Sequence, residues 1–536
     1  MERISSEKLT YAIVIALAAT VLFPILFLPL GRDQGWNAFM GMAFARGEWL
    51  YLASADFNMI GHRFWNMALY AFFGNSMMAI RIAELFVVGL ALVFLARQLS
   101  RVLQTPLWSV AIMFIAFTYA SLGYYHTGER DCFVLMFLLQ ALCLFISDGQ
   151  VPTIKNKVLC GLMVAAAVMF RQTYAIFAIL FVVLFLVMSR GNRFRSMLWL
   201  FLGSSVLPVL FAVAYLLKGG LPALYGVYYN LIELPKMTYS SWGMGPFNVS
   251  VIGMHFSYAW VMLASAAVLT GVAAFRVYVP SAAGAVRGVI GKIFGARDDA
   301  GARAFMFALT AIVSYAIIVF IQGSFQPYHL VVLLSFAGLL VIIAASWIYD
   351  TIAEEKRNNM TYGVVMMFVL CCVLFINRDT INKLRIIQEN YRGFHHHLLR
   401  KDVFSPDAPD YWPQAHRELG TYIATITSHN DRIQMWVMDP DPYFYADRLA
   451  STRHFSPMFI WMSNNAVSKQ FYREFLEQLL AAPPRVFVVE RYDRKLGNPD
   501  YIVDDITAYP EVVAFLKGRF RYDRRIGNYD VYRLIP

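Results

Sequence analysis

Long apolar runs separated by short polar loops make up most of the first 377 residues. A helix needs about 20 apolar residues to cross the hydrocarbon core of a bilayer. Runs of that kind predict about eleven membrane-spanning helices, centred near residues 20, 88, 115, 139, 164, 181, 207, 263, 313, 337 and 369. Arg171 and Gln172 divide one long run into the two short spans near 164 and 181. The pattern therefore predicts a polytopic α-helical membrane protein.

From residue 378 onwards the apolar runs become shorter and charged residues become more frequent. RIQMWVM, RVFVVERY and the terminal YDVYRL have the composition and spacing of strands. The stretches 412–427 and 466–481 have the spacing of amphipathic helices. We therefore expect residues 378–536 to form a separate α/β domain, of a size that is normal for a unit with its own core.

The loop after the first span, residues 31–78, contains two short helical patterns. The first follows Asp33 and stops at Gly47, and the second stops at Gly74. Because a glycine commonly ends a helix, both patterns predict short helices, which we expect to lie in the membrane interface. An aspartate before the first helical turn is a favoured N-cap. Taken alone, Asp33 is therefore equally a helix cap or a catalytic group, and the two roles are compatible.

The composition supports the membrane assignment, since 59% of the residues are hydrophobic and 15% are charged, against about 25% charged in soluble domains. The formal net charge of +11 indicates membrane topology and attraction to anionic headgroups, not nucleic-acid binding. We find no P-loop, no HExxH and no GxGxxG on a strand–helix unit. We therefore expect neither a nucleotide nor a redox cofactor. The five cysteines lie in or beside apolar runs, which indicates packing and not a disulfide framework.

Lysine and arginine collect in alternate loops, for example at Arg97 and Arg101 or at Lys155 and Lys157. Such loops are the cytoplasmic ones in most membrane proteins. The distribution predicts a cytoplasmic N-terminus and an exoplasmic segment from about Arg378. We expect a multi-pass protein of a bacterial inner or plasma membrane, with residues 1–377 as its membrane domain.

This orientation gathers the unusual polar residues of the loops on the outer face. They are Asp33, Asp56, His62 and Arg63 in the first outer loop, His126, Glu129, Arg130 and Asp131 in the second, Arg171 and Gln172 in the third, and Gln326, Tyr328 and His329 in the fifth. Ionisable residues at membrane depth are costly enough to indicate function. Together, the carboxylates, histidines and arginines could hold a divalent cation or a phosphate.

Several of these residues also have a purely structural interpretation. Carboxylates such as Glu129 and Asp131 are stabilised at a helix N-terminus. Arg171 could extend to lipid headgroups or clamp a phosphate with its forked donors. His329 follows Pro327 at a helix start, which suits either an anion ligand or an interfacial anchor. Asp439 and Asp441 in the sequence DPDP are expected to be turn residues.

The first loop, DQGWNAFMGMAFARGEWLYLASADFNMIGHRFWNMALYAFFGNSMMAIR, resembles the opening of the GT-C-type membrane glycosyltransferases that use lipid-linked sugar donors. It is most similar to the protein O-mannosyltransferase and lipid A aminoarabinose transferase superfamily. The matching positions are Asp33, Asp56, His62 with Arg63, and FFGNS followed by Arg81; GERD, FRQT and QPYHL resemble later outer-loop elements. His62 stands where many relatives have lysine, no Pro-Pro follows it, and Gln34 stands where a second acid is common. The resemblance covers most of the chain.

The resemblance implies a GT-C-like fold and transfer of a sugar, with inversion, from a polyprenyl phosphate to a hydroxyl of a glycan, lipid or protein at the outer face. It implies Asp33 as the base and His62, Arg63, Arg171 and His329 as contacts of the donor phosphate. Asp56, Glu129 and Asp131 would form an acidic site, in which Glu129 and Asp131 are the candidate metal ligands. His126, Gln172 and Tyr328 would shape the substrate site.

Two other functions stay open at this point. A lipid or polysaccharide transporter or flippase would show midplane charges, inverted repeats or broken helices, and none is evident in the sequence. An oligosaccharide ligase that uses a diphosphate-lipid donor would share the outer-face site and differ mainly in its donor.

Overall fold

The computed structural model describes residues 2–54, 56, 58–103, 106–150, 153–188, 192–234, 300–322, 327–356, 384–392, 413–461, 466–491 and 506–536. The chain divides into two compact units. Unit 1 consists of Met1–Leu26, Ile82–Val213 and Gly245–Arg392, and unit 2 consists of Phe27–Arg81, Ala214–Met244 and Gly393–Pro536.

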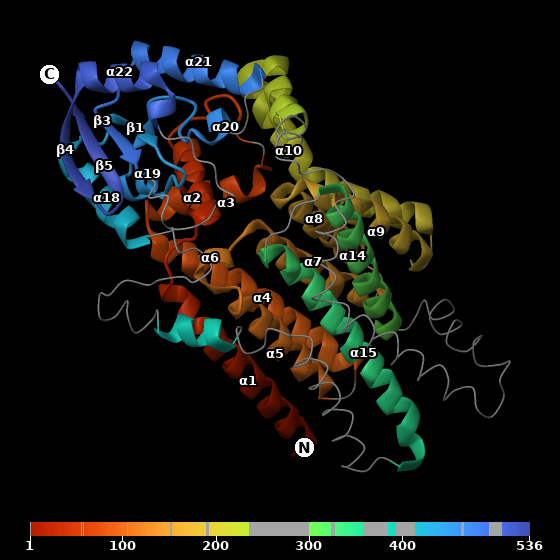
Figure 1. Ribbon diagram of the computed structural model, residues 1–536. Coiled ribbons are helices and arrows are strands. Elements are labelled where there is room, and N and C mark those ends of the chain that lie inside the picture. The colour runs from red at the N-terminus through yellow and green to blue at the C-terminus, as the bar shows by residue number, and fades with distance from the viewer. Residues whose placement is uncertain are drawn as a thin grey trace. The chain divides into compact units, whose positions relative to one another are not determined.

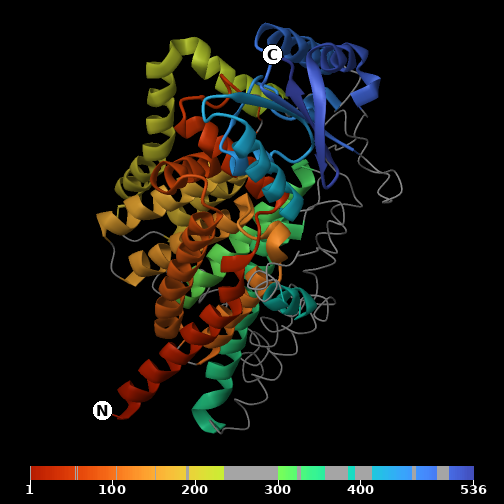
Figure 2. The same ribbon diagram turned by 90° about the vertical axis from the view of Figure 1, so that its left-hand side faces the viewer.

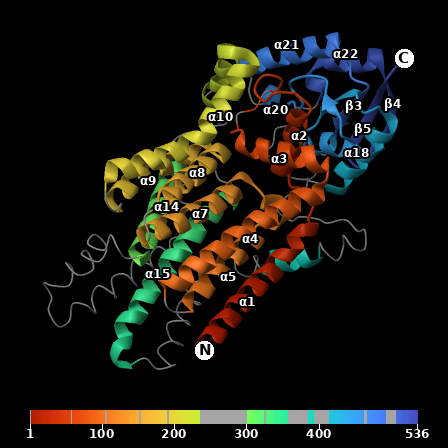
Figure 3. The same cartoon turned by 180° about the vertical axis from the view of Figure 1, so that it is seen from behind.

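Unit 1 is helical in the part that the structure describes. Its main helices are α1 (Glu2–Leu22), α4 (Met77–Val102), α5 (Leu107–Ala120), α6 (Gly123–His126), α7 (Arg130–Gln150), α8 (Ile154–Phe170), α9 (Ala175–Met188), α10 (Arg193–Tyr228), α14 (Ala300–Gln322) and α15 (Leu330–Lys356), of which α4 and α10 continue into unit 2. Helix α1 packs along α5, α5 along α15, and α15 along α14 (Figure 3). Short 3₁₀ turns, η2 (Gln172–Tyr174) and η4 (Pro327–His329), precede α9 and α15.

Five of the described helices are long and apolar enough to cross a membrane: Lys8–Phe27, Met77–Val102, Arg130–Asp148, Arg193–Glu233 and Ala300–Ile321. Three shorter apolar helices are Leu107–Ala120, Gln172–Met188 and Leu330–Ser346. Large apolar side chains such as Leu9 on α1 and Leu217 on α10 are exposed, as expected of lipid-facing surfaces. The predicted polytopic helical fold is thus confirmed, whereas the spans predicted near 263 and 369 lie outside the described residues.

Two interruptions of the helices have local causes. Arg171 ends α8 in extended conformation and separates it from η2 and α9, as the division of the apolar run predicted. Helix α10 is broken at Gly219 and Gly220, where the backbone leaves the helical region and Gly220 has a φ of 66°. Glycine accepts that angle without the strain that a Cβ would add. The π-helical turn η3 (Tyr229–Glu233) follows directly.

Unit 2 contains a five-stranded sheet in the order β2-β1-β3-β5-β4. The strands are β1 (Arg432–Trp436), β2 (Leu449–Ala450), β3 (Val486–Glu490), β4 (Phe520–Ile526) and β5 (Tyr529–Leu534). Strand β1 is parallel to β2 and β3, and the pairs β3–β5 and β5–β4 are antiparallel. The strands predicted at β1, β3 and β5 are confirmed.

Helices cover both faces of this sheet. α21 (Ala466–Ala481) and α22 (Pro510–Arg519) lie on one side, and α18 (Pro413–Ile426) lies on the other (Figures 1 and 2). All five residues of the central strand β3 are buried, as expected of a strand covered on both faces. The predicted amphipathic helices therefore correspond to α18 and α21, almost to the residue.

The two helices of the first loop, α2 (Arg32–Ala45) and α3 (Gly61–Phe73), belong to unit 2. α2 packs on α19 (Asp441–Ala446), where Phe39 stacks on Tyr443 with ring centroids 4.7 Å apart. Every residue from Gln34 to Phe44 is buried. Protein therefore covers both sides of α2, and the expected position of this helix at the membrane interface stays a prediction. The structure also draws the domain boundary differently, since it groups the first loop with the C-terminal domain.

Candidate functional site

Asp33 lies in the first turn of α2 and is partly buried. The N-cap residue is Gly31, whose N–H donates to Oε1 of Gln34 at 3.2 Å. The expectation that Asp33 caps the helix is therefore wrong, because the chain enters the helix two residues earlier and Gln34 satisfies the cap. The carboxylate of Asp33 instead occupies a position that the positive end of the helix favours.

Asp56 and Arg63 form a buried ion pair in the same loop. Nη2 of Arg63 donates to Oδ2 of Asp56 at 2.8 Å, and each side chain is 1% exposed. The other oxygen of Asp56 accepts from N and Nδ2 of Asn58, at 3.1 and 3.0 Å. The Asp56 N–H donates to Oδ1 of Asn230 at 3.4 Å. Both carboxylate oxygens of Asp56 thus accept hydrogen bonds, and the ion pair holds the guanidinium of Arg63 in one orientation.

Two further donor groups of Arg63 are buried. Among the residues that the structure describes, its Nε and Nη1 meet no hydrogen-bond acceptor. Burying a donor without an acceptor is costly, so this geometry suits a ligand that brings its own oxygens. Arg63 and His62 lie in the first turn of α3, where free backbone N–H groups also attract anions. His62 is itself buried.

In unit 1, Asp131 and Arg171 form a second buried ion pair. Nη1 of Arg171 donates to Oδ2 of Asp131, and the Tyr174 hydroxyl donates to Oδ1 at 3.2 Å. The pair joins the first residues of α7 to the end of α8. The pair thus joins one candidate residue of the second outer loop to one of the third and gives Arg171 an intramolecular partner.

The aromatic residues predicted to shape the substrate site also meet. The rings of His126 and Tyr328 are 5.6 Å apart, and those of Tyr328 and His329 are 4.7 Å apart. All three side chains are buried, as is Glu129, whereas Gln172 is partly exposed. Their substrate contacts stay predictions. Asp33, Asp56, His62 and Arg63 belong to unit 2, and the remaining predicted residues belong to unit 1.

Metal binding by Glu129 and Asp131 also stays a prediction. Within the described ranges, no group of three or more His, Cys, Asp or Glu side chains could hold a metal ion. Both oxygens of Asp131 already accept from Arg171 and Tyr174, so a cation would have to compete with them.

The sequence reasoning missed Glu84, which is buried in α4. Its Oε1 accepts from the Tyr119 hydroxyl at 2.6 Å, and that hydroxyl accepts from the Gly128 N–H at 3.2 Å. This chain of contacts fixes the backbone next to Glu129. The sequence did contain a signal for Glu84, because a single carboxylate within an apolar span is energetically costly and therefore indicates a function.

Two solved structures resemble the whole chain. Both are of ArnT from Cupriavidus metallidurans, one bound to undecaprenyl phosphate and one in the apo state. The first has a TM-score of 0.55 at 14% identity, and the second has 0.50 at 15% identity; each match covers 97% of both chains. No protein-family model and no curated protein matches the sequence. At these identities the likeness establishes the fold: this chain has the GT-C-like fold of ArnT, with a C-terminal α/β domain.

Proposed function

We propose that this protein is an inverting glycosyltransferase that moves a sugar from a polyprenyl phosphate to an acceptor hydroxyl at the outer face of the membrane. One observation carries the proposal, namely the buried guanidinium of Arg63 in the first turn of α3, whose Nε and Nη1 meet no acceptor among the described residues. An ArnT structure of the same fold is bound to undecaprenyl phosphate. A phosphate monoester has oxygen atoms that can accept hydrogen bonds from these two donor groups of Arg63.

The reaction follows from general chemistry at these residues. The Asp33 carboxylate accepts the proton of the acceptor hydroxyl, and the resulting oxygen attacks the anomeric carbon opposite the phosphate. The bond between that carbon and the phosphate oxygen breaks, and its electron pair leaves with the phosphate. Arg63 and the N-terminal N–H groups of α3 stabilise the charge that develops there. The configuration at the anomeric carbon inverts.

Mass spectrometry of lipids that co-purify with the protein tests the donor class directly. We expect undecaprenyl phosphate or its monoglycosyl derivative. Release of undecaprenyl phosphate from a panel of undecaprenyl-phosphate hexoses and pentoses, in membranes that contain native acceptors, then tests transfer. Co-purification of diphosphate lipids alone, with no release from the monophosphate panel, would replace this proposal with the ligase.

Arg63→Lys should weaken binding of undecaprenyl phosphate by about 10- to 100-fold. A hydrogen bond to a charged group contributes about 1.5–3 kcal/mol, and about 1.4 kcal/mol is a factor of ten. Lysine keeps the positive charge. Its single ammonium group lacks the planar set of donors with which a guanidinium can bind Asp56 and a phosphate at the same time. Kd for undecaprenyl phosphate measures the effect, and Arg417→Lys, at an exposed position of α18, is the control. An unchanged Kd in folded Arg63→Lys protein would remove Arg63 from the phosphate site.

The proposed orientation makes a separate prediction. Asn430 is exposed in the turn between α18 and β1, and unit 2 should face the outside. Asn430→Cys should therefore add labelling by a membrane-impermeant maleimide on intact cells, relative to the parent protein. Labelling that requires permeabilised cells would reverse the orientation.

A further inference from the structure

The carboxyl ends of β1 and β3 form the place where open α/β sheets bind ligands. The chain passes from β1 to β2 on one side and then returns to β3 on the other side. At such a reversal of strand order, a crevice opens at the carboxyl ends of the two parallel strands. Asp439 follows β1 by three residues, and Glu490 is the last residue of β3. Both side chains are buried.

In this protein, a side chain of the first loop contacts the segment that follows β1. Arg32, the first residue of α2, donates from Nε to Oδ1 of Asp439 and from Nη2 to Oδ2, the latter at 3.3 Å. The side chain of Asp439 is 1% exposed and that of Arg32 is 14% exposed. Asp439 and Asp441 are therefore not simple turn residues, as the sequence suggested, because their carboxylates face other elements of unit 2.

Asp441 contacts the same turn of α2. A Cβ added at Gly35 would lie 1.9 Å from Oδ1 of Asp441, so the carboxylate rests directly on the helix backbone. The other oxygen, Oδ2, pairs with Nδ1 of His416 at 3.3 Å, and Nε2 of His416 contacts the Tyr529 hydroxyl at 2.5 Å. Tyr529 in turn donates to Oε1 of Glu490 at 3.4 Å. This buried chain of polar contacts restrains the carboxylates that hold α2.

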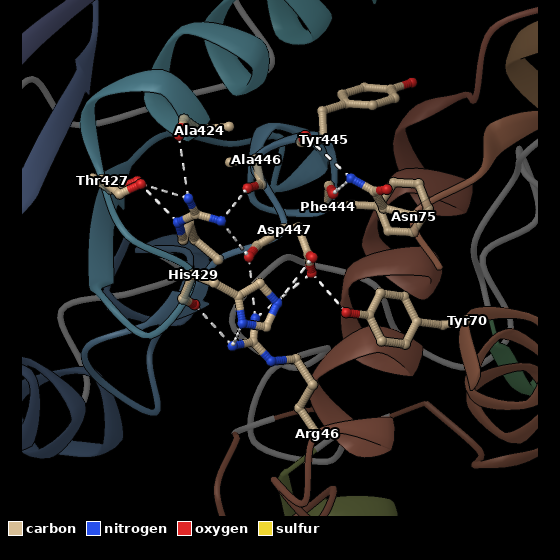
Figure 4. Close-up of polar contacts among 11 residues, drawn as sticks. Arg46, Tyr70, Asn75, Ala424, Thr427, His429, Phe444, Tyr445, Ala446 and Asp447 are labelled. Atoms are coloured by element: carbon tan, nitrogen blue, oxygen red, sulfur yellow. Dashed lines mark hydrogen bonds and ion pairs between the residues drawn. The ribbon is translucent and has the colours of Figure 1, made fainter. Parts of the chain in front are cut away.

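The other end of α2 is held by the same domain. Arg46, the C-cap residue of α2, donates from Nη1 to the backbone oxygen of Asp447 at 3.1 Å. The Tyr70 hydroxyl of α3 donates to Oδ1 of Asp447 at 2.7 Å, and His429 contacts Oδ2 at 3.1 Å (Figure 4). Asp439 and Asp447 flank α19, so the residues on either side of that short helix are bonded to the two ends of α2. The position of α2 is fixed by the C-terminal domain.

We propose that Asp439 is a positioning residue for the sugar-transfer reaction: it holds Arg32, which fixes the first turn of α2 and thereby the carboxylate of Asp33. This inference rests on the proposed function and adds a role for the C-terminal domain. Asp33 directly follows Arg32 in the chain, so loss of the ion pair would let the base move. Misplacement of a reacting group by about 1 Å can cost about 10²-fold in rate.

Burial and neighbouring charges also shift the pKa of Asp439. Burial raises the pKa of Asp439 from 3.8 to about 6, because the attraction of Arg32 and His416 is too weak to cancel it and Glu490 and Asp441 repel the charge. The folded protein therefore binds a proton more tightly than the unfolded chain, and stability falls as the pH rises from about 4 to about 6.

Asp439→Asn in the full-length protein, reconstituted in lipid nanodiscs, tests this role. Hydrogen exchange of the α2 amides should become at least about tenfold faster. kcat for release of undecaprenyl phosphate should fall by about 10- to 100-fold, whereas KM for the donor should change less than about twofold, since Asp439 touches no substrate. The rate of the unmodified protein should decline as the pH is lowered through about 6, and Asp439→Asn should lack that decline.

Two further variants separate positioning from general damage. Arg32→Lys changes a partly exposed side chain, leaves the C-terminal domain intact, and should reproduce both effects. Asp530→Asn is the matched control, because Asp530 is also a buried aspartate that pairs with arginines, Arg491 and Arg525, and it should change neither quantity. Unchanged exchange and kcat in Arg32→Lys and Asp439→Asn, or equal losses in Asp530→Asn, would overturn the inference. Absence of any release by the unmodified protein would overturn the proposed function instead, while the exchange data still decide whether Asp439 holds α2.

Discussion

Asp33→Asn should reduce the rate of sugar transfer by about 10²- to 10⁴-fold, which is the usual contribution of a general base. The amide has nearly the same shape as the carboxylate but cannot take the acceptor's proton. The loss should appear in kcat, because Asp33 would act on the acceptor hydroxyl during the chemical step. Binding of undecaprenyl phosphate should be unchanged, since Arg63 and not Asp33 is proposed to contact the phosphate.

The structure makes this experiment interpretable. Gly31 and Gln34 supply the cap of α2, so removing the Asp33 charge should leave the helix and the fold of unit 2 intact. Asp431→Asn is the control, because Asp431 lies in the turn before β1 and bonds only its own turn through Ser428 among the described contacts. Transfer at a near-normal rate in Asp33→Asn would exclude Asp33 as the base and return it to a purely electrostatic role at the helix start.

Elements with a strong local signal were predictable from the sequence. Glycines placed the ends of α2 and α3, and Gly47 and Gly74 do have positive φ angles of 89° and 64°. Arg171 within an apolar run predicted the break between α8 and α9. The missed strands are β2, with two residues, and β4, whose FRYDRRI sequence is mostly exposed at the edge of the sheet. β2 is too short to show a periodicity, and β4 lacks the buried apolar pattern on which strand prediction depends.

Contacts between distant parts of the chain were not predictable in the same way. Arg32 and Asp439 are 407 positions apart, and no periodicity in either segment indicates the partner. The sequence could therefore identify the first loop and the C-terminal domain separately, but not their union in unit 2. Even the ion pair of Asp56 with Arg63, which are only seven positions apart, was not indicated by the sequence pattern. The sequence identified the candidate residues by their chemical type. Their partners became visible only in the tertiary structure.

Asp131→Asn should lower the free energy of unfolding by about 3–5 kcal/mol, because it removes the carboxylate charge that pairs with the buried Arg171 guanidinium. The two side chains are 2% and 6% exposed, so water cannot replace the lost carboxylate. Denaturant titration in detergent, followed by the far-UV signal, measures the loss. Asp148→Asn is a matched comparison, since Asp148 pairs with Lys157 and both side chains are buried; a similar loss there would show the general cost of breaking a buried pair.

The double variant Asp131→Leu with Arg171→Met separates the two interpretations of Arg171. Replacing a whole buried ion pair by apolar residues is often neutral or stabilising, so most of the lost stability should return. If Arg171 serves only the pair with Asp131, the folded double variant binds undecaprenyl phosphate with an unchanged Kd. If it also contacts the donor phosphate, Kd rises by about tenfold or more, as expected for a lost charge-assisted hydrogen bond. Failure of the double variant to recover stability would show that the ion pair itself, and not the uncompensated charge, stabilises the junction of α7 and α8.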